Sequence, residues 1–288
     1  MNYLKSIITL FIFTLTSHLS NAQEETVLEN SVLWKIEHPD LKEASYIFGT
    51  LHFMCESDFN IPEKVTETLN HVDALVLEVN LTDPEEMQIL QETMSNPKKI
   101  SDELSEIQFK EIATLVQKEM GIPLIDLDTY GLSTLHALLL TKMLPCTQFK
   151  FTETEITTLA KEKQLPIYSL EKVSEQLATL ENSYPADFMF DQLMLFESYK
   201  TDFNASIAAY KKEDLTTAVD LIMKDIYMDE NATTMMQINR NKNWVEKIPE
   251  MIKTRSNLFA VGAAHLVGEF GIVNLLRQKG YTITPVFN

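Results

Sequence analysis

The sequence predicts an α/β fold, in which a central mixed, mainly parallel sheet is flanked by helices and extended by helical insertions. Two observations support this prediction. Short apolar runs bounded by turn residues alternate with amphipathic stretches, which is the pattern of strand–helix–strand units. These apolar runs lie near both ends and in the middle of the 288-residue chain, so strands that are distant in the sequence must share one sheet.

The first 22 residues have the pattern of a secretory signal peptide. Lys5 precedes an apolar stretch over residues 7–15, and the small residues 20–22 offer a cleavage site. This stretch is shorter than the roughly 20 apolar residues of a membrane-spanning helix, although an uncleaved anchor is the alternative. We therefore expect residues 23–288 to be exported to the periplasm or the extracellular space, with no membrane span after cleavage.

The composition favours an acidic globular protein. The formal net charge is −18, and loss of the signal peptide, whose only charged side chain is Lys5, makes it more negative by one. Such a surface opposes binding to nucleic acid and to anionic membranes, so the expected partners are peptides or small molecules. The length suits one α/β domain over residues 23–288 with helical insertions at about 84–144 and 173–252.

The amino-terminal elements form a predicted hairpin followed by a strand–helix–strand unit. The hairpin strands are expected over residues 32–35 and 44–53, with a turn around Asp40. A proline opens a short helix over residues 62–72, and the apolar run 74–80 is typical of a strand buried on both faces. This spacing predicts parallel pairing of the strands.

The remaining chain contains two further units between helical stretches. Residues 84–144 have a helical pattern, and so do residues 173–252. Between these stretches, a helix over residues 155–164 precedes a strand over 167–171. The last unit consists of a strand over 258–266, a helix over 273–279 that Gly280 ends, and a final strand over 281–287.

Two Gly-x-x-His motifs follow two of the predicted strands. Gly49 and His52 follow the strand residues SYIF, and Gly262 and His265 follow LFAV. Glycine lets the chain turn or a ligand approach the backbone closely. Side chains at the carboxyl ends of parallel strands point into the crevice where α/β proteins bind ligands. We therefore expect both histidines in one site, and two hydrogen-bonded core histidines are the alternative.

Two carboxylates end the other internal strands. Glu78 and Glu171 are costly to bury unless they are paired or bind a cation. Two histidines with one or two glutamates are a competent ligand set for Mn, Fe, Co, Zn or Ni. The alternatives are an ion pair for Glu78, with Arg240 as the natural partner, and capping of the following helix by Glu171.

The chain has two cysteines, Cys55 and Cys146. An even number in an exported protein makes a disulfide plausible, and metal ligand and nucleophile are the rival roles. Neither cysteine lies in a CxxC or a recognisable nucleophile motif, so we favour the disulfide. Because Cys55 follows His52 by three residues, such a bond would brace the loop that carries this histidine.

Over about residues 33–286 the chain resembles the TraB/PrgY/GumN family, which includes the Tiki metalloproteases. The resemblance begins with LWKI and YIFGTLHF and continues through ALVLEVNL and LAKEKQLPIYSLEKVSEQLATL. NRNKNW is similar to the family's E-R-N-x-x-W segment, and AVGAAHLVGEFGIVNLLRQKGYTITPV is the most specific match. The chain departs from the family at Phe151-Thr152-Glu153, where Glu153 stands in place of an aspartate, at Asn239 and at Ser169.

The resemblance implies the α/β fold of erythromycin-esterase-like hydrolases and a divalent metal such as Mn, Co, Zn or Fe. The implied metal ligands are His52, His265 and Glu78. The implied catalytic residues are Glu78, Glu171 and Arg240, and the implied pocket-forming residues are Gly49, Gly262 and Asn241.

The first functional hypothesis is an exported metal-dependent hydrolase, a Tiki-like peptidase or amidase. A metal would activate water, Glu171 or Glu78 would move the proton, and Arg240 would orient a carboxylate or stabilise the oxyanion. One alternative is a non-catalytic protein that binds a peptide, a metal or haem in the same pocket. Another is a metal-independent esterase in which a His–Glu pair activates water.

Overall fold

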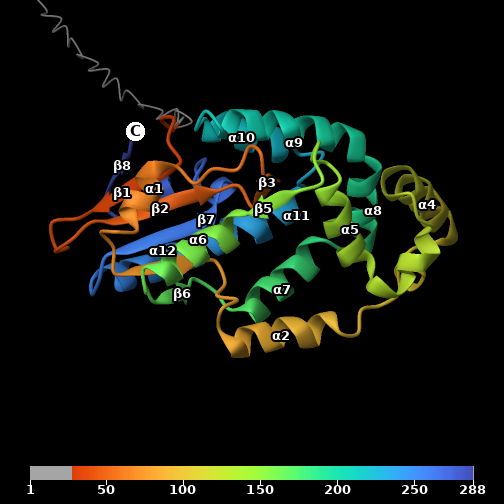
Figure 1. The fold of residues 1–288 in the computed structure, drawn as a ribbon, viewed down its shortest axis with the longest axis horizontal. Coiled ribbons are helices and arrows are strands. Elements are labelled where there is room, and N and C mark those ends of the chain that lie inside the picture. Colours follow the sequence, from red (N-terminus) through yellow and green to blue (C-terminus); the bar gives the residue numbers. More distant parts are fainter. Residues whose placement is uncertain (1–27, 288) are drawn as a thin grey trace, which may run out of the picture.

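The computed structural model describes residues 28–287, so the expected signal peptide lies outside the described residues. At its centre is a six-stranded sheet with the order β6-β4-β7-β2-β1-β8 (Figure 1). Its adjacent parallel strands are β6 (Ile167–Ser169), β4 (Ala74–Leu77), β7 (Asn257–Gly262) and β2 (Ser45–Thr50). β1 (Leu33–Glu37) is antiparallel to both β2 and β8 (Thr282–Pro285). The predicted α/β fold with a mixed, mainly parallel sheet is confirmed.

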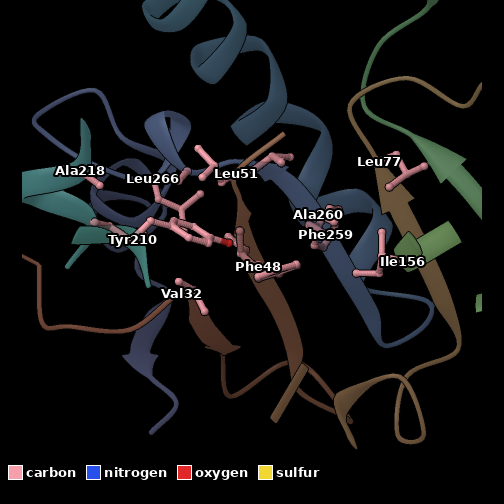
Figure 2. Packing of buried hydrophobic residues seen from close by; sticks show 14 of the residues in the cluster. Val32, Phe48, Leu51, Leu77, Ile156, Tyr210, Ala218, Phe259, Ala260 and Leu266 are labelled. Carbon is pink, nitrogen blue, oxygen red and sulfur yellow. The ribbon is translucent and has the colours of Figure 1, made fainter. Parts of the chain in front are cut away.

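The middle of the sheet is the hydrophobic core. Every residue of β4 and β7 is buried, because these strands have neighbours on both sides and packing on both faces. Phe48 of β2 lies opposite Ala260 of β7 in the parallel register. Figure 2 shows these two side chains with Phe259, and it shows Tyr210 and Leu266 beside the end of β2. The Tyr210 hydroxyl donates to the Gly49 carbonyl oxygen over 2.8 Å, which ties a helix to that strand end.

Helices connect the strands and cover the sheet. Four helices lead into strands of the six-stranded sheet: α1 (Glu63–Thr68), α6 (Thr152–Glu162), α12 (Arg240–Ile252) and α13 (Ile272–Gln278). The stretch expected as the first insertion contains α2 (Pro84–Met94), α3 (Ile100–Glu103), α4 (Glu106–Met120), the 3-10 helix η1 (Leu124–Tyr130) and α5 (Leu132–Thr141). None of the helices within residues 28–287 is long and apolar enough to cross a membrane.

The stretch expected as the second insertion is also helical. It contains α7 (Val173–Ser183), α8 (Ala186–Met194), α9 (Phe196–Tyr210), α10 (Leu215–Ile222), α11 (Glu230–Thr233), the π-helical turn η2 (Thr234–Asn239) and α12. In Figure 1, α9 and α10 run along one side of the molecule, and α2 and α7 run along the opposite side. Helices α4, α5 and α8 lie at the end remote from β1 and β8.

The strand expected over residues 44–53 is interrupted in the structure. β2 ends at Thr50, His52 lies in a bend, and β3 (Phe53–Cys55) pairs with β5 (Phe149–Phe151) in a second, two-stranded sheet. The break arises because Thr152 takes the backbone partners here: its N–H donates to the His52 carbonyl over 3.0 Å and its hydroxyl donates to the Leu51 carbonyl. β5 was not predicted, because a strand of three residues shows no periodicity in the sequence.

Candidate functional site

The site lies at the carboxyl edge of the four parallel strands. Glu171 follows β6, Glu78 follows β4, His265 ends the 3-10 turn η3 (Ala263–His265) after β7, and His52 follows β2. Because these strands are neighbours in the sheet, the four side chains stand in one row. The backbone keeps Glu78 and Glu171 side by side, with the Glu171 N–H donating to the Glu78 carbonyl over 3.0 Å. The structure therefore brings together the four residues that the strand ends predicted.

Arg240, the first residue of α12, is the centre of this row and is 5% exposed. Its Nε and Nη2 donate to Glu171 over 3.1 and 2.7 Å, and Nη2 also donates to Glu78 Oε2 over 2.6 Å. Its Nη1 donates to His265 Nε2 over 3.1 Å and to the Met236 carbonyl over 3.2 Å. A guanidinium has five N–H groups. The bonds just described supply an acceptor within the protein for each of them. The ion pair between Arg240 and Glu78, the alternative interpretation of Glu78, is confirmed.

Glu171 is enclosed by donors and is 8% exposed. Besides Arg240, it accepts from Trp244 Nε1 over 3.2 Å and from Gln176 Nε2 over 3.2 Å. The Trp244 ring also lies 4.6 Å from the guanidinium carbon of Arg240. Glu171 does not cap α7, because Glu175 and Glu86 accept from the first backbone N–H groups there. Its carboxylate instead balances the buried arginine.

His265 is a neutral imidazole with a fixed tautomer. Arginine can only donate, so Nε2 accepts from Arg240 and Nδ1 carries the proton, which it donates to Asn241 Oδ1 over 2.7 Å. The Asn241 amide nitrogen donates to the His265 and Phe270 carbonyls, which leaves Oδ1 as the acceptor. Desolvation, helped by the charges of Arg240 and His52, lowers the pKa of His265 to about 3. Asn241 therefore orients the histidine.

Glu78 is ionised. Its Oε2 accepts from Arg240, and its Oε1 accepts from the Gly262 N–H over 2.7 Å and lies 3.8 Å from His265 Nε2. Desolvation opposes ionisation, but the basic groups His265, Arg240 and His52 outweigh it, and the pKa falls to about 2. Since His265 is neutral, Arg240 and His52 supply the positive charge that holds this carboxylate ionised near neutral pH.

His52 is the accessible member of the row, with a side chain that is 60% exposed. Its Nδ1 lies 2.7 Å from Glu153 Oε1, which also accepts from the Thr50 hydroxyl over 2.9 Å. Desolvation opposes a positive charge on the ring, yet the Glu153 carboxylate outweighs it and raises the pKa of His52 to about 9. Glu153 was absent from the predicted site residues. Its only signal in the sequence was its place at the family's aspartate position.

The two motif glycines have different roles. A Cβ added at Gly262 would lie 3.3 Å from His52 Nε2, 3.4 Å from Glu78 Oε1 and 3.5 Å from His265 Cδ2. The three side chains therefore converge on one point that only glycine leaves open. A Cβ at Gly49 would instead lie 3.1 Å from a Leu266 methyl group and 3.2 Å from the Ala263 Cα. Gly49 thus permits close packing below the site and does not border this open space.

In the structure, the expected metal ligands His52, His265 and Glu78 are not arranged as a ligand set. His265 Nε2 accepts from Arg240, so this nitrogen faces a cation and not an open position. Within residues 28–287, no group of three or more His, Cys, Asp or Glu side chains has the arrangement of a metal site. The metal therefore remains a prediction.

The predicted disulfide is present between Cys55, at the end of β3, and Cys146, in the segment before β5. The Cα atoms of the two residues are 5.9 Å apart. Because Cys55 follows His52 by three residues, the bond ties the loop of this histidine to the strand that leads to Glu153.

Comparison with protein families identifies one match that spans nearly all of the described chain. The model of the TraB/PrgY/gumN family matches residues 32–285. This match includes every residue of the row and Glu153. No curated protein and no solved structure was found to match the chain.

Proposed function

Because the chain belongs to the TraB/PrgY/gumN family, we propose that it is an exported hydrolase of ester or amide bonds in which His52 moves the proton. One observation carries the proposal. His52 is accessible, Glu153 binds its Nδ1, and its Nε2 faces the same point beside Gly262 as the Glu78 carboxylate. A charged imidazole and an ionised carboxylate that face one point can serve as the acid and the base of a hydrolysis.

His52 supplies the acid. Glu153 holds Nδ1, so Nε2 is the nitrogen that reaches substrate. With a pKa of about 9, the ring is charged near neutral pH, and Nε2 can donate its proton to the leaving alcohol or amine. The same proton also stabilises the negative charge that develops on the substrate oxygen during attack.

Glu78 supplies the base. Its Oε1 is held by the Gly262 N–H and faces the point that His52 also faces. A water molecule bound there would attack the substrate carbonyl carbon and lose its proton to this carboxylate. The bond to the leaving group then breaks as His52 protonates it, which gives a carboxylic acid and an alcohol or amine.

Arg240 and Glu171 act as positioning residues in this proposal. The five donors of Arg240 are engaged inside the protein, so it fixes Glu78 and His265 and does not contact substrate. Glu171 neutralises the arginine and accepts from Trp244. These two predicted catalytic residues therefore contribute through the geometry of Glu78.

Export is supported by the bond between Cys55 and Cys146, since disulfides form and persist in oxidising compartments. The acidic composition fits peptide or small-molecule substrates better than nucleic acid. We therefore place the activity in the periplasm or the extracellular space.

A metal-dependent peptidase is the second candidate. It is favoured by His52 Nε2 and Glu78 Oε1, which lie 3.3 and 3.4 Å from one point beside Gly262, where the ring carbon Cδ2 of His265 lies at 3.5 Å. A divalent ion would lower the pKa of a bound water molecule and polarise a carbonyl. This candidate requires His265 to exchange its bond with Arg240 for the ion, which the structure does not show.

The proposed function is tested with the purified chain and two probes, p-nitrophenyl acetate and a pool of internally quenched peptides. Wild type is compared with His52→Gln and Glu153→Gln. His71→Gln is the matched control, because His71 is an exposed histidine after α1, outside the site. Turnover of either probe that both site variants lose and the control keeps supports the proposal. Absence of turnover of both probes by wild type overturns it and favours the non-catalytic binding protein.

A further inference from the structure

The disulfide closes a ring of bonds that contains the proposed acid. Cys55 lies three residues after His52, and Cys146 lies seven residues before Glu153. A covalent path runs from His52 through the disulfide to Glu153. The 2.7 Å contact between His52 Nδ1 and Glu153 Oε1 closes this path into a ring. The disulfide is thus the only covalent link in the described chain that joins these two short segments directly.

Apart from this bond, noncovalent contacts alone hold the two segments together. Besides a short ladder, these are the ring contacts of Phe53 with Phe149 and Phe151, and the hydroxyl bonds from Thr50 to Glu153 and from Thr152 to Leu51. β3 and β5 form a separate sheet of two strands with three residues each, from the pair Phe53–Phe151 to the pair Cys55–Phe149. One further backbone bond at each end, from Thr152 to His52 and from Glu56 to Gln148, extends the ladder. A two-stranded ladder of this size is marginal by itself. The six-stranded sheet, in contrast, contains neither cysteine.

The disulfide is accessible from one side. Cys146 is partly exposed, whereas Cys55 is 4% exposed. A cavity of about 500 Å³ is lined by Cys55, by Leu144 and Pro145 beside Cys146, and by Lys211 and Lys212. Because Cys146 is the more exposed of the two cysteines, an incoming thiolate would reach its Sγ first. The departing Cys55 thiolate would lie in a cavity that holds Lys212 and the ion pair of Lys211 with Asp58, and the lysines favour it as a leaving group.

We propose that Cys55–Cys146 is a reversible redox modification site, whose reduction by a dithiol disconnects Glu153 from His52 and lowers hydrolysis. One partner thiolate attacks Cys146 Sγ, forms a mixed disulfide and releases the Cys55 thiolate, which takes up a proton. The second partner thiolate then attacks the partner's own sulfur in the mixed disulfide and releases Cys146. The partner is oxidised to a disulfide, and this chain is reduced to two thiols. The effect on hydrolysis rests on the proposed function, whereas the loosening of the two segments does not.

The test uses the full chain in buffers of reduced and oxidised dithiothreitol. Thiol content and amide hydrogen exchange are measured along the titration, together with p-nitrophenyl acetate turnover after subtraction of the direct reaction of dithiothreitol in a protein-free blank. We expect exchange to accelerate in residues 52–56 and 147–153 and to stay unchanged in β4 and β7. We expect kcat to fall about 10- to 100-fold with KM unchanged, at the same midpoint as the thiol content, and to return on reoxidation.

The double variant Cys55→Ser/Cys146→Ser supplies the control. It should show the exchange and the kcat of the reduced chain and should not respond to dithiothreitol. The proposal is overturned if the fully reduced chain keeps the exchange pattern and turnover of the oxidised chain. It is also overturned if reduction accelerates exchange in β4 and β7 to the same degree, because the bond would then be a purely structural cross-link. If no probe is turned over, the proposed function is what fails. The exchange pattern then still tests whether reduction loosens the two segments.

Discussion

Arg240 donates to His265 Nε2 over 3.1 Å, and this hydrogen bond determines what the histidine can do. It fixes a neutral ring with its proton on Nδ1, where Asn241 accepts it. The nitrogen that would bind a metal or accept a proton from substrate is occupied by a cation. His265 therefore belongs to the scaffold that holds Glu78, and the accessible His52 is left to exchange protons.

Replacing Arg240 should strongly destabilise the fold. Arg240→Met leaves the carboxylates of Glu78 and Glu171 buried without their cation, and we expect a loss of about 3–5 kcal/mol in the free energy of unfolding. Urea denaturation measures this loss. Arg255→Met is the control, since Arg255 is an exposed arginine that stacks on Tyr168. A similar, small loss for both variants would contradict the central role of Arg240.

Glu153→Gln should lower turnover with little effect on stability, because Glu153 lies at the exposed side of the site. The variant should also move the pH profile. Wild-type His52, with its pKa raised to about 9, stays protonated as an acid up to that pH, and turnover should decline above it. Without the carboxylate the pKa falls, so the decline should begin at lower pH. Identical alkaline limbs in the two proteins would show that Glu153 does not tune His52.

Alanine at the two motif glycines should have different effects, on turnover at one position and on thermal stability at the other. Gly262→Ala places a methyl group on the point shared by His52 and Glu78, so we expect turnover to fall while the melting temperature changes little. Gly49→Ala places a methyl group against Leu266 and the Ala263 backbone, so we expect mainly a lower melting temperature. Turnover and thermal denaturation are measured on both variants. Equal effects of the two on turnover would argue against the open space beside Gly262 as the reaction site.

The strand-end residues could be predicted from the sequence, but their bonding could not. Parallel strands end at the same edge of a sheet. The residues that follow SYIF, ALVL, IYS and LFAV therefore lie close together for any arrangement of the connecting helices. The sequence gives no register for a three-residue strand, so β5 and the approach of Glu153 to His52 were missed. Arg240 was assigned to the pocket by resemblance, and only three-dimensional contacts reveal that all its donors are used.

His136, which lies outside the site, should make the stability of the fold depend on pH. Burial in α5 lowers its pKa to about 4, from 6.5. The stabilisation is complete above pH 6.5 and is lost as the pH falls toward 4, because the unfolded chain binds a proton that the folded chain does not. His136→Gln, which does not titrate, should lose less stability between about pH 7.5 and about pH 4.5 in urea denaturation. Equal losses in both proteins would show that His136 is not a source of this dependence.

The most direct test of the account is the turnover of p-nitrophenyl acetate and the quenched peptides by the full chain after chelator treatment, with metal content measured on the same sample. Proton transfer by His52 and Glu78 predicts that the metal-free wild type keeps its kcat and that metal-free His52→Gln loses about 10²- to 10⁴-fold. Loss of wild-type turnover on chelation and its recovery with Mn²⁺ or Co²⁺ would contradict the account and establish the metal-dependent peptidase in its place.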